Sequence, residues 1–430
     1  MARHRPRARL AVLALALLPP LRSGRAADWP QWRGPDLRGT SPERGLALRW
    51  SAEDNVAWKL ALPTGSGSTA IISGDRVFLN VADGDTVHLW CVDRRTGAVS
   101  WKRAIGSSAG HAHRKHNMST PSPVTDGRRV IVMTGRGALK GFDFEGRELW
   151  SRDLEKEYGP FGLQWGYGSS PLLEGDTVYV QVLHGSNTSA PSYFLGIDAG
   201  SGRNRFRVER RTPAVAECPD AYTTPVVARR GGRAEIVVTG GDVVTGHDPS
   251  TGEERWRASG LNPDRNPNYR VVASPVAVED LVVAPSRVKP MLVLRAFGSG
   301  DVTASARMWS FDQGPDVPTP ASDGRHLYVV NDKGILWCLD LQTGKPHYGP
   351  QRLRVGTYSA SPLLADGKLY VTSEDGLTSV VKAGPAYELL AENPLDDFTV
   401  SSPAAASGQI FLRTRQALYC IGRKATAAGP

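Results

Sequence analysis

The sequence predicts an all-β fold, an eight-bladed β-propeller in which an N-terminal strand closes the last blade. The first observation is a sequence motif that recurs eight times: a Ser/Thr-Pro step, a short apolar run, a glycine turn, and a run rich in valine and tyrosine. Successive copies are 53, 48, 54, 50, 45, 42 and 41 residues apart. Such a period is typical of a propeller with one four-stranded blade per repeat. The anchors are Ala70, where the proline is lost, Pro123, Pro171, Pro225, Pro275, Pro320, Pro362 and Pro403.

The second observation is that the two ends of the repeat array complement each other. The last repeat provides strands from Ser402, over 409–414 and over 417–421, and no fourth strand follows. Near the N-terminus, residues 56–59 have no repeat of their own but are similar to the outer strand of the first blade at Trp101. We therefore expect Trp58 on the outer strand of the eighth blade, so that no sheet edge is exposed there.

Within each repeat, strand A begins at the Ser/Thr-Pro step, because proline is tolerated as the first residue of a strand. A glycine turn leads to strand B. Strand C ends in aspartate, and a second tight turn with Thr-Gly or Ser-Gly leads to strand D. We expect the A–B and C–D connections to be short and the D–A and B–C connections to be long, on opposite faces. Four residues after the second turn's glycine comes an aromatic residue, and a shorter variant occurs in the second repeat: Trp101, Phe206, Trp256, Tyr348 and, in the variant, Trp150.

This aspartate, Thr-Gly and aromatic spacing resembles the tryptophan-docking motif of the pyrroloquinoline-quinone (PQQ)-like propellers. That family includes the quinoprotein alcohol dehydrogenases and the assembly propeller BamB. The resemblance covers essentially the whole mature chain, and it implies that the aromatic residues pack between blades. Blade five, around Trp309, and blade seven, around Tyr387, have degenerate motifs. The signature of WD40 repeats is absent.

The first 26 residues are predicted to be a secretory signal peptide. Four arginines precede an apolar run at 10–18, and small residues stand at the −3 and −1 positions, Gly24 and Ala26. A retained membrane anchor is the alternative. No cysteine suited to lipid attachment follows, because the first is Cys91. The segment holds six arginines and no acidic residue, and removing them from the formal net charge of +9 leaves +3. A nucleic-acid partner is therefore not indicated.

These features divide the chain into four parts: a signal peptide at 1–26, an extension on the outside of the ring at 27–50, the propeller at 51–424, and a disordered tail at 425–430. The four cysteines are expected to be free thiols. Three of them share one strand-C position in separate blades, too far apart for the Cα separation of a disulfide; they are Cys91, Cys338 and Cys420, and the fourth is Cys218.

Candidate binding residues gather in the D–A loops around the channel mouth. Most are aromatic residues just upstream of a Ser/Thr-Pro step or belong to one loop rich in histidine. Such aromatic residues either form a binding rim or fill the gaps between blades. The candidates are His111, His113, Arg114, His116, Trp165, Tyr167, Tyr222, Tyr269, Arg270 and Tyr358.

The histidine loop also has metal-like spacing, but Arg114 and Lys115 would oppose a bound cation, so we favour a basic or anion-binding loop and expect no metal site. Asp220, Glu217 and Asp316 could act as acids or bases, although nothing distinguishes them from solvated loop carboxylates. No catalytic residue is assigned. The resemblance to quinoprotein dehydrogenases implies a quinone, calcium and adjacent cysteines, and no two cysteines are adjacent here.

The resulting hypothesis is an exported, non-catalytic, monomeric propeller, periplasmic or extracellular, that binds a protein partner or a small ligand at the channel mouth. We expect no cofactor, no nucleic acid and no transmembrane segment in the mature chain. The alternative is a PQQ-dependent oxidoreductase that holds its quinone and calcium in the channel.

Overall fold

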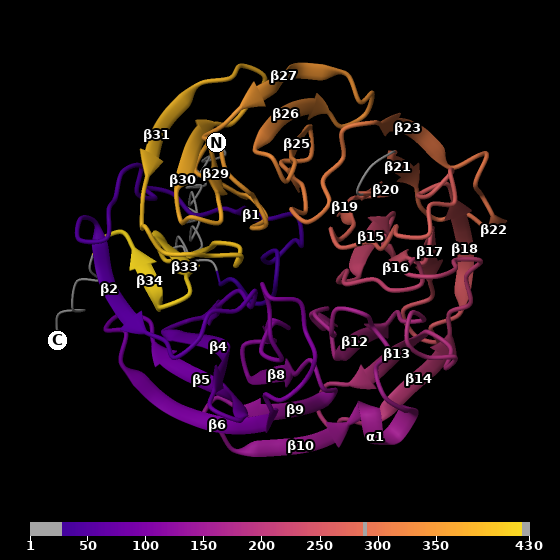
Figure 1. Ribbon diagram of the computed structural model, residues 1–430, viewed down its shortest axis with the longest axis horizontal. Coiled ribbons are helices and arrows are strands. Elements are labelled where there is room, and N and C mark those ends of the chain that lie inside the picture. The colour runs from indigo at the N-terminus through magenta and orange to yellow at the C-terminus, as the bar shows by residue number, and fades with distance from the viewer. Residues whose placement is uncertain (1–27, 287–289, 424–430) are drawn as a thin grey trace, which may run out of the picture.

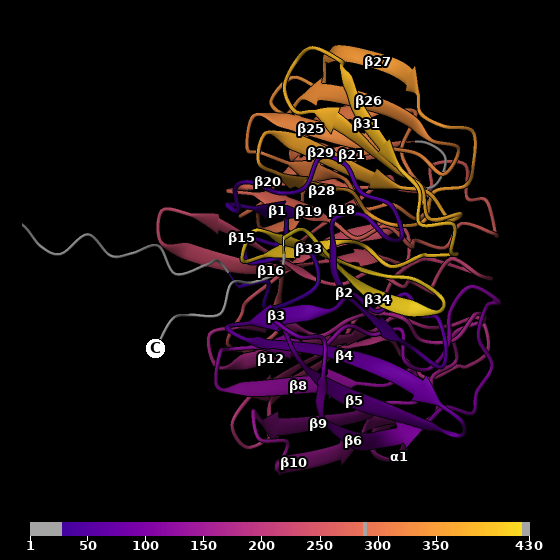
Figure 2. The same ribbon diagram turned by 90° about the vertical axis from the view of Figure 1, so that its left-hand side faces the viewer.

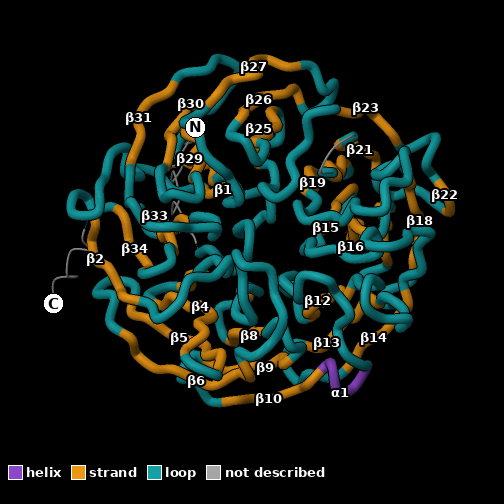
Figure 3. Tube along the Cα trace, viewed as in Figure 1, coloured by secondary structure: helices purple, strands orange, loops and turns teal. Residues whose placement is uncertain are grey.

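The computed structural model describes residues 28–286 and 290–423, and its eight sheets stand around one central channel (Figure 1). This confirms the predicted eight-bladed propeller. Strands and loops make up nearly all of the described chain, with a single short helix, α1 (Leu154–Tyr158) (Figure 3). The expected signal peptide and C-terminal tail lie outside the described residues. Across the described part, no helix combines the length and apolar character needed to cross a membrane.

In blades one to four, strands A to D follow one another from the channel to the rim, each antiparallel to the next. Their bounds are β3 (Ile71–Ser73), β4 (Arg76–Asp83), β5 (Thr86–Asp93), β6 (Val99–Ser107); β7 (Val124–Thr125), β8 (Arg129–Met133), β9 (Ala138–Asp143), β10 (Glu148–Asp153); β11 (Leu172–Glu174), β12 (Thr177–Val182), β13 (Tyr193–Asp198), β14 (Asn204–Glu209); and β15 (Val226–Arg230), β16 (Arg233–Gly240), β17 (Val243–His247), β18 (Glu254–Ser259).

Blades five to eight repeat this order, with β2 as strand D of blade eight. Two short strands join other blades by parallel pairing, β22 (Gly300–Asp301) on β18 and β1 (Thr40–Ser41) on β28. The bounds are β19 (Val276–Val278), β20 (Leu281–Ala284), β21 (Met291–Arg295), β23 (Arg307–Phe311); β24 (Ala321–Ser322), β25 (His326–Val330), β26 (Ile335–Asp340), β27 (Pro346–Arg352); β28 (Leu363–Ala365), β29 (Lys368–Thr372), β30 (Thr378–Lys382), β31 (Leu389–Asn393); and β32 (Ala404–Ala406), β33 (Gln409–Arg413), β34 (Ala417–Ile421), β2 (Val56–Ala61).

The ring closes as the sequence predicts. β2 pairs with β34, and Trp58 lies opposite Cys420. A buried arginine strengthens the same junction: the Arg413 guanidinium donates to the carbonyl oxygens of Asn80 at 2.6 Å and Thr64 at 3.1 Å. These contacts join blade eight to blade one, so both ends of the repeat array stabilise one sheet edge.

The aromatic residues on strand D pack between blades. The Trp101 indole donates to the Phe144 carbonyl at 3.0 Å, and a Cβ added at Gly146 would lie 2.9 Å from that indole. Glycine is therefore required in the turn of the next blade because the ring rests on it. Blade five was expected to be degenerate, but Trp309 docks in the same way, donating to Leu341 O at 3.0 Å. The C–D connection of blade five is longer and includes β22, which hides the usual spacing.

All four cysteines are free and buried, as predicted. Three lie on strand C opposite the docking position of strand D: Cys91 pairs with Trp101, Cys338 with Tyr348, and Cys420 with Trp58. A small side chain is needed where the neighbouring strand carries a large ring.

The recurring Ser/Thr-Pro step forms a ring of hydroxyl groups around the channel. In each case the Ser or Thr hydroxyl accepts the backbone N–H of the equivalent residue in the preceding blade, as at Ser274, which accepts from Thr224 at 2.8 Å. The Thr69 hydroxyl donates to Ser402 O at 3.2 Å and closes the circle. The proline that follows carries no N–H, so this position leaves no unpaired donor. The seven accepting residues are Ser122, Ser170, Thr224, Ser274, Thr319, Ser361 and Ser402.

Residues 28–41 of the extension expected on the outside of the ring instead cross the channel, so for these residues that prediction was wrong. Residues 28–41, which we call the strap, contact the innermost strands: Trp29 pairs with Ile72, and β1 lies beside β28 (Figure 2). The Arg33 guanidinium donates to Pro362 O at 2.7 Å and Pro320 O at 2.9 Å. The inner strands present unpaired backbone groups toward the channel, and the strap satisfies several of them. The chain then runs outward to Trp50, whose N–H donates to Asn393 at 2.9 Å.

The loop lengths also differ from the expectation in one respect. The D–A connections are long, but the B–C connections are mostly tight turns; of those described in full, only that of blade three, residues 183–192, is long. The D–A loops, together with the long B–C loop of blade three, therefore build most of the elaborate face. The strap lies at the other face, where the Asp28 carboxylate accepts the N–H of Gly74 in an A–B turn at 2.9 Å.

Candidate functional site

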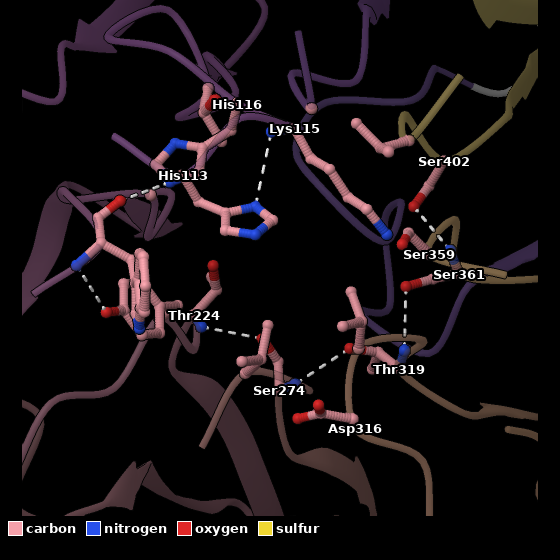
Figure 4. Close-up of a pocket in the computed structure, with 18 of the residues that line it drawn as sticks. His113, Lys115, His116, Thr224, Ser274, Asp316, Thr319, Ser359, Ser361 and Ser402 are labelled. Carbon is pink, nitrogen blue, oxygen red and sulfur yellow. Dashed lines mark hydrogen bonds between the residues drawn. The ribbon is translucent and has the colours of Figure 1, made fainter. Parts of the chain in front are cut away.

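A cavity of about 480 Å³ occupies the channel between the D–A loops and the strap (Figure 4). All seven accepting hydroxyls line it, and Trp32 lines it from the strap. The strap forms hydrogen bonds to inner strands on several sides of the channel, as Pro30 O does with Thr125 and Arg38 O with Ser322. The strap therefore covers one end of the channel, and the opposite end lies among the D–A loops.

The structure brings together six of the ten candidate residues. His113, Arg114, His116, Trp165, Tyr222 and Arg270 line the cavity. His111 is exposed, with its ring 6.4 Å from that of Trp165. Tyr167, Tyr269 and Tyr358 are buried and do not line the cavity. For Tyr167 and Tyr358, the gap-filling alternative holds, because both belong to the hydrophobic clusters between blades.

The histidine loop is folded against Trp165. The His116 ring has Nε2 2.7 Å from the Trp165 carbonyl oxygen, and the His113 ring meets the indole edge to face at 5.6 Å. Burial lowers the pKa of His116. Burial also lowers the pKa of His113, and three cations add to the decrease: Lys115, Arg114 and Arg270. Among the residues that the structure describes, no three side chains of metal-ligating type are grouped to hold a metal ion.

Trp165 forms a fixed aromatic wall. Its backbone N–H donates to the Tyr222 hydroxyl at 3.2 Å, and its indole N–H donates to the Glu217 carboxylate at 2.9 Å. Glu217 also lies 3.3 Å from Nε of Arg270. The aromatic and cationic residues at the mouth are thus held by neighbouring loops before any ligand binds, which lowers the entropic cost of binding.

Lys115 and Asp316 enter the cavity from different sides, and the Arg270 guanidinium, which also lines the cavity, lies 3.9 Å from the Asp316 carboxylate. Lys115 and Arg114 come from the loop between blades one and two, and Asp316 comes from the loop between blades five and six; in Figure 4, Lys115 and Asp316 are on opposite sides. The Lys115 ammonium pairs with Glu374 of blade seven at 2.6 Å, and the Ser359 hydroxyl donates to the same carboxylate. Across the described part of the chain, no hydrogen bond or ion pair involves the Arg114 guanidinium.

Asp332 is the second carboxylate on the cavity wall. It accepts the backbone N–H groups of Asp316 at 2.7 Å and Val317 at 3.1 Å. Burial raises the pKa of Asp332 to about 6; the N–H of Asp316 opposes the rise and the Asp316 carboxylate adds to it. The carboxyl group therefore changes charge in a mildly acidic solution.

Asp220 has a structural role. Its fully buried carboxylate accepts three backbone N–H groups, from Gln164 at 2.7 Å, Gly185 at 2.9 Å and Ser186 at 3.1 Å. These bonds join the loop that carries Trp165 to the long B–C loop of blade three. An acid or base role for Asp220 would conflict with this fully occupied environment.

The sequence interpretation missed two residues that line the cavity, Trp32 and Asp332, and one that pairs with the cavity residue Lys115, Glu374. Trp32 was assigned to the outside of the ring, and Asp332 and Glu374 lie in B–C turns that carried no distinguishing pattern. The hydroxyl ring did have a signal, because the Ser/Thr-Pro step is the repeat itself. It was interpreted only as the start of a strand.

The sequence comparisons with known proteins match this chain to BamB. A family model described as outer membrane protein assembly factor BamB matches residues 40–159 and 91–348. Outer membrane protein assembly factor BamB of Alkalilimnicola ehrlichii is 32% identical over 164 residues, or 35% of this chain and 40% of that protein. The match thus spans about two fifths of the relative's length.

Solved structures share the fold. BamB from Moraxella catarrhalis matches with a TM-score of 0.59 and 12% identity, over 85% of this chain and 99% of that chain. A quinohemoprotein alcohol dehydrogenase from Pseudomonas putida HK5 matches with a TM-score of 0.68 and 12% identity, over 94% and 81%. At these identities, the likenesses show the fold alone.

Proposed function

Because this chain belongs to the family whose model is described as outer membrane protein assembly factor BamB, we propose that it is a non-catalytic propeller that binds another protein on its D–A loop face. The proposed process is the assembly of outer membrane proteins. The proposed location is outside the cytoplasm, either periplasmic or extracellular. The targeting sequence predicted for residues 1–26 supports this location.

One observation carries the proposal: three titratable groups at or behind the cavity wall hold loop backbone in place. Asp220 accepts three N–H groups, Asp332 accepts two, and the Tyr222 hydroxyl accepts one. Such groups stabilise a preformed surface of Trp165 and Arg270, and aromatic residues and arginine dominate the energetics of protein interfaces.

A quinone-dependent oxidoreductase is the second candidate. The fold likeness to a quinohemoprotein alcohol dehydrogenase favours it, as does a cavity in the size range of small-ligand sites. The residues present do not fit a calcium-bound quinone. Only two carboxylates from the described residues, Asp316 and Asp332, line the cavity, and none of the four cysteines does.

Site-specific photo-crosslinking in cells tests the proposal. A photoreactive amino acid replaces His111, which is exposed at the rim, and the matched control replaces Arg128, which is exposed in an A–B turn on the opposite face. We expect the rim position to crosslink reproducibly to a protein of outer membrane assembly, identified by mass spectrometry, and the control position to give no such product. Equal crosslinking at both positions would contradict the assignment of the face.

A separate measurement tests the oxidoreductase alternative. The purified protein is incubated with PQQ and calcium, and its absorption spectrum is recorded after gel filtration. We expect no quinone to remain with the protein. Stoichiometric retention of the quinone, together with alcohol-dependent reduction of a dye, would overturn the non-catalytic proposal.

A further inference from the structure

Three of the charged side chains that line the cavity are paired within the protein. The Lys115 ammonium lies 2.6 Å from the Glu374 carboxylate. The Arg270 guanidinium lies 3.3 Å from the Glu217 carboxylate and 3.9 Å from that of Asp316. A charged ligand would have to compete with these pairs, because a buried charge is stable only beside a partner of opposite sign.

The other charged and titratable groups on the cavity wall also favour an uncharged ligand. Asp332 accepts two backbone N–H groups, and Arg114 is exposed, so that water solvates its guanidinium. Burial lowers the pKa values of His113 and His116, which favours their neutral forms. The cavity therefore suits a ligand that has no net charge and forms hydrogen bonds on several sides.

The hydroxyl ring supplies hydrogen-bond donors around the channel. Each of its seven hydroxyls accepts a backbone N–H, and none of them donates to another group in the described part of the chain. The seven residues are at most 7% exposed, and in Figure 4 those labelled follow one another around the cavity: Thr224, Ser274, Thr319, Ser361 and Ser402. A hydroxyl has one proton to donate, so the ring presents O–H groups to the ligand.

Hydrogen-bond acceptors lie in the same cavity. A carboxylate offers about four lone-pair sites, and Asp332 uses two of them for backbone N–H groups. An alcohol hydroxyl both accepts and donates, so it can bind to the ring and to Asp332 at the same time. A carbonyl oxygen only accepts. The combination of donors and acceptors therefore favours a ligand with several hydroxyl groups.

Two tryptophan residues line the cavity from its two ends. Trp165 belongs to a D–A loop, and Trp32 belongs to the strap. The indole N–H of Trp165 already donates to Glu217 at 2.9 Å, so the carbon surface of the ring remains for a ligand. A pyranose sugar carries hydroxyl groups around its edge and C–H groups on its two faces. This distribution matches donors around the channel and aromatic rings at its ends.

From these observations we propose that the cavity binds an uncharged saccharide, with its hydroxyl groups on the hydroxyl ring and Asp332 and a C–H face against Trp165. The volume of about 480 Å³ is in the range of small-ligand pockets, about 300–1,000 Å³, and accommodates a disaccharide. Because the strap covers one end, a longer glycan could enter only by its terminus. A free saccharide and the end of a glycan chain thus offer the same chemistry. This inference goes beyond the proposed function and does not rest on it.

Saturation-transfer difference NMR with the purified protein tests the proposal. The probes are four uncharged disaccharides that differ in stereochemistry: maltose, lactose, mannobiose and N,N′-diacetylchitobiose. We expect at least one of them to receive saturation, most strongly at the C–H protons of one ring face, because these protons lie against Trp165. No transfer to any of the four at millimolar concentration would overturn the proposal.

A matched ligand tests the absence of charge without any change to the protein. In this ligand, one hydroxymethyl group of the disaccharide that binds is oxidised to a carboxylate. We expect the oxidised form to bind about tenfold more weakly, because its charge finds no unpaired cation inside the cavity. Equal or tighter binding of the oxidised form would overturn the assignment of an uncharged ligand.

A variant identifies the aromatic wall. Trp165→Ala is expected to weaken the disaccharide at least about tenfold. The matched control is Phe297→Ala, which removes a half-buried aromatic ring in the C–D connection of blade five, beside Arg230 and Arg233 and on the opposite face. Equal affinities of the wild type and Trp165→Ala would overturn the placement of the saccharide.

Attachment of the disaccharide to agarose through its reducing end separates the two sources. Retention of the protein on this resin, with release by the free disaccharide, supports the terminus of a glycan chain. Binding of the free disaccharide without retention supports a free saccharide. Crosslinking at His111 reports on the protein partner and does not depend on these measurements, so the two proposals can fail separately.

Discussion

Replacing Asp220 by alanine should release two loops of the D–A face while leaving the blades folded. The buried carboxylate accepts three backbone N–H groups, two of them on Oδ1, from Gly185 and Ser186, and one on Oδ2, from Gln164. A hydrogen bond to a charged group contributes about 1.5–3 kcal/mol. Because two donors share one oxygen and the freed loops reach water, we expect a total of about 4 kcal/mol rather than the sum.

Hydrogen exchange followed by mass spectrometry measures this effect locally. A loss of about 4 kcal/mol corresponds to nearly a thousandfold faster exchange, in peptides covering residues 160–168 and 183–190. Asp220→Asn should accelerate exchange less, because the amide oxygen still accepts hydrogen bonds. The amide nitrogen only donates, so one of the three backbone N–H groups loses its acceptor. The control is Asp264→Ala, an exposed carboxylate in a neighbouring D–A loop. Unchanged exchange in Asp220→Ala would refute the assignment of Asp220 as the link between these loops.

Two further predictions concern blade packing and pH. Trp150→Ala should destabilise the fold by about 3–5 kcal/mol in urea unfolding, because the buried indole donates to Ala199 O at 3.0 Å and covers Gly202; a loss below about 1 kcal/mol would contradict inter-blade docking. Burial raises the pKa of Asp332 to about 6 from an ordinary value of 3.8, so between these pH values the folded state binds more protons than the unfolded state. The unfolding free energy should therefore fall as pH rises from about 4 to about 6, by up to about 3 kcal/mol. Asp332→Asn should flatten this part of the pH profile relative to the wild type, and parallel profiles would show that Asp332 does not cause the slope.

The fold could be predicted from the sequence because its determinants are local and repeated. The unpaired strand at Trp58 and the missing strand after Ile421 were enough to place the closure of the ring. Trp309 was missed as a docking residue because its blade has a longer C–D connection, which breaks the spacing on which the motif depends. The structural role of a position can therefore persist where its local pattern is lost.

The candidate site was predictable only in part, for a different physical reason. Trp165 and Arg270 belong to long loops that stand out against the repeat, and both line the cavity. Asp332 lies in a tight turn like many others, and only the ring brings it next to Asp316. The strap was misplaced because the backbone groups that it satisfies, such as Ile72 O, belong to inner strands whose unpaired state cannot be seen in one-dimensional spacing.

Repetition also decides where specificity can arise in this molecule. Seven blades contribute the same hydroxyl to the channel, and a ring of equivalent donors cannot by itself orient a ligand. The D–A loops differ from blade to blade, so they break the symmetry, with Arg114 on one side and Asp316 on another. The strap breaks it again along the channel axis by covering one end. A ligand that uses both the ring and the loops would thus be held by uniform donors from the ring and oriented by the side chains of the loops.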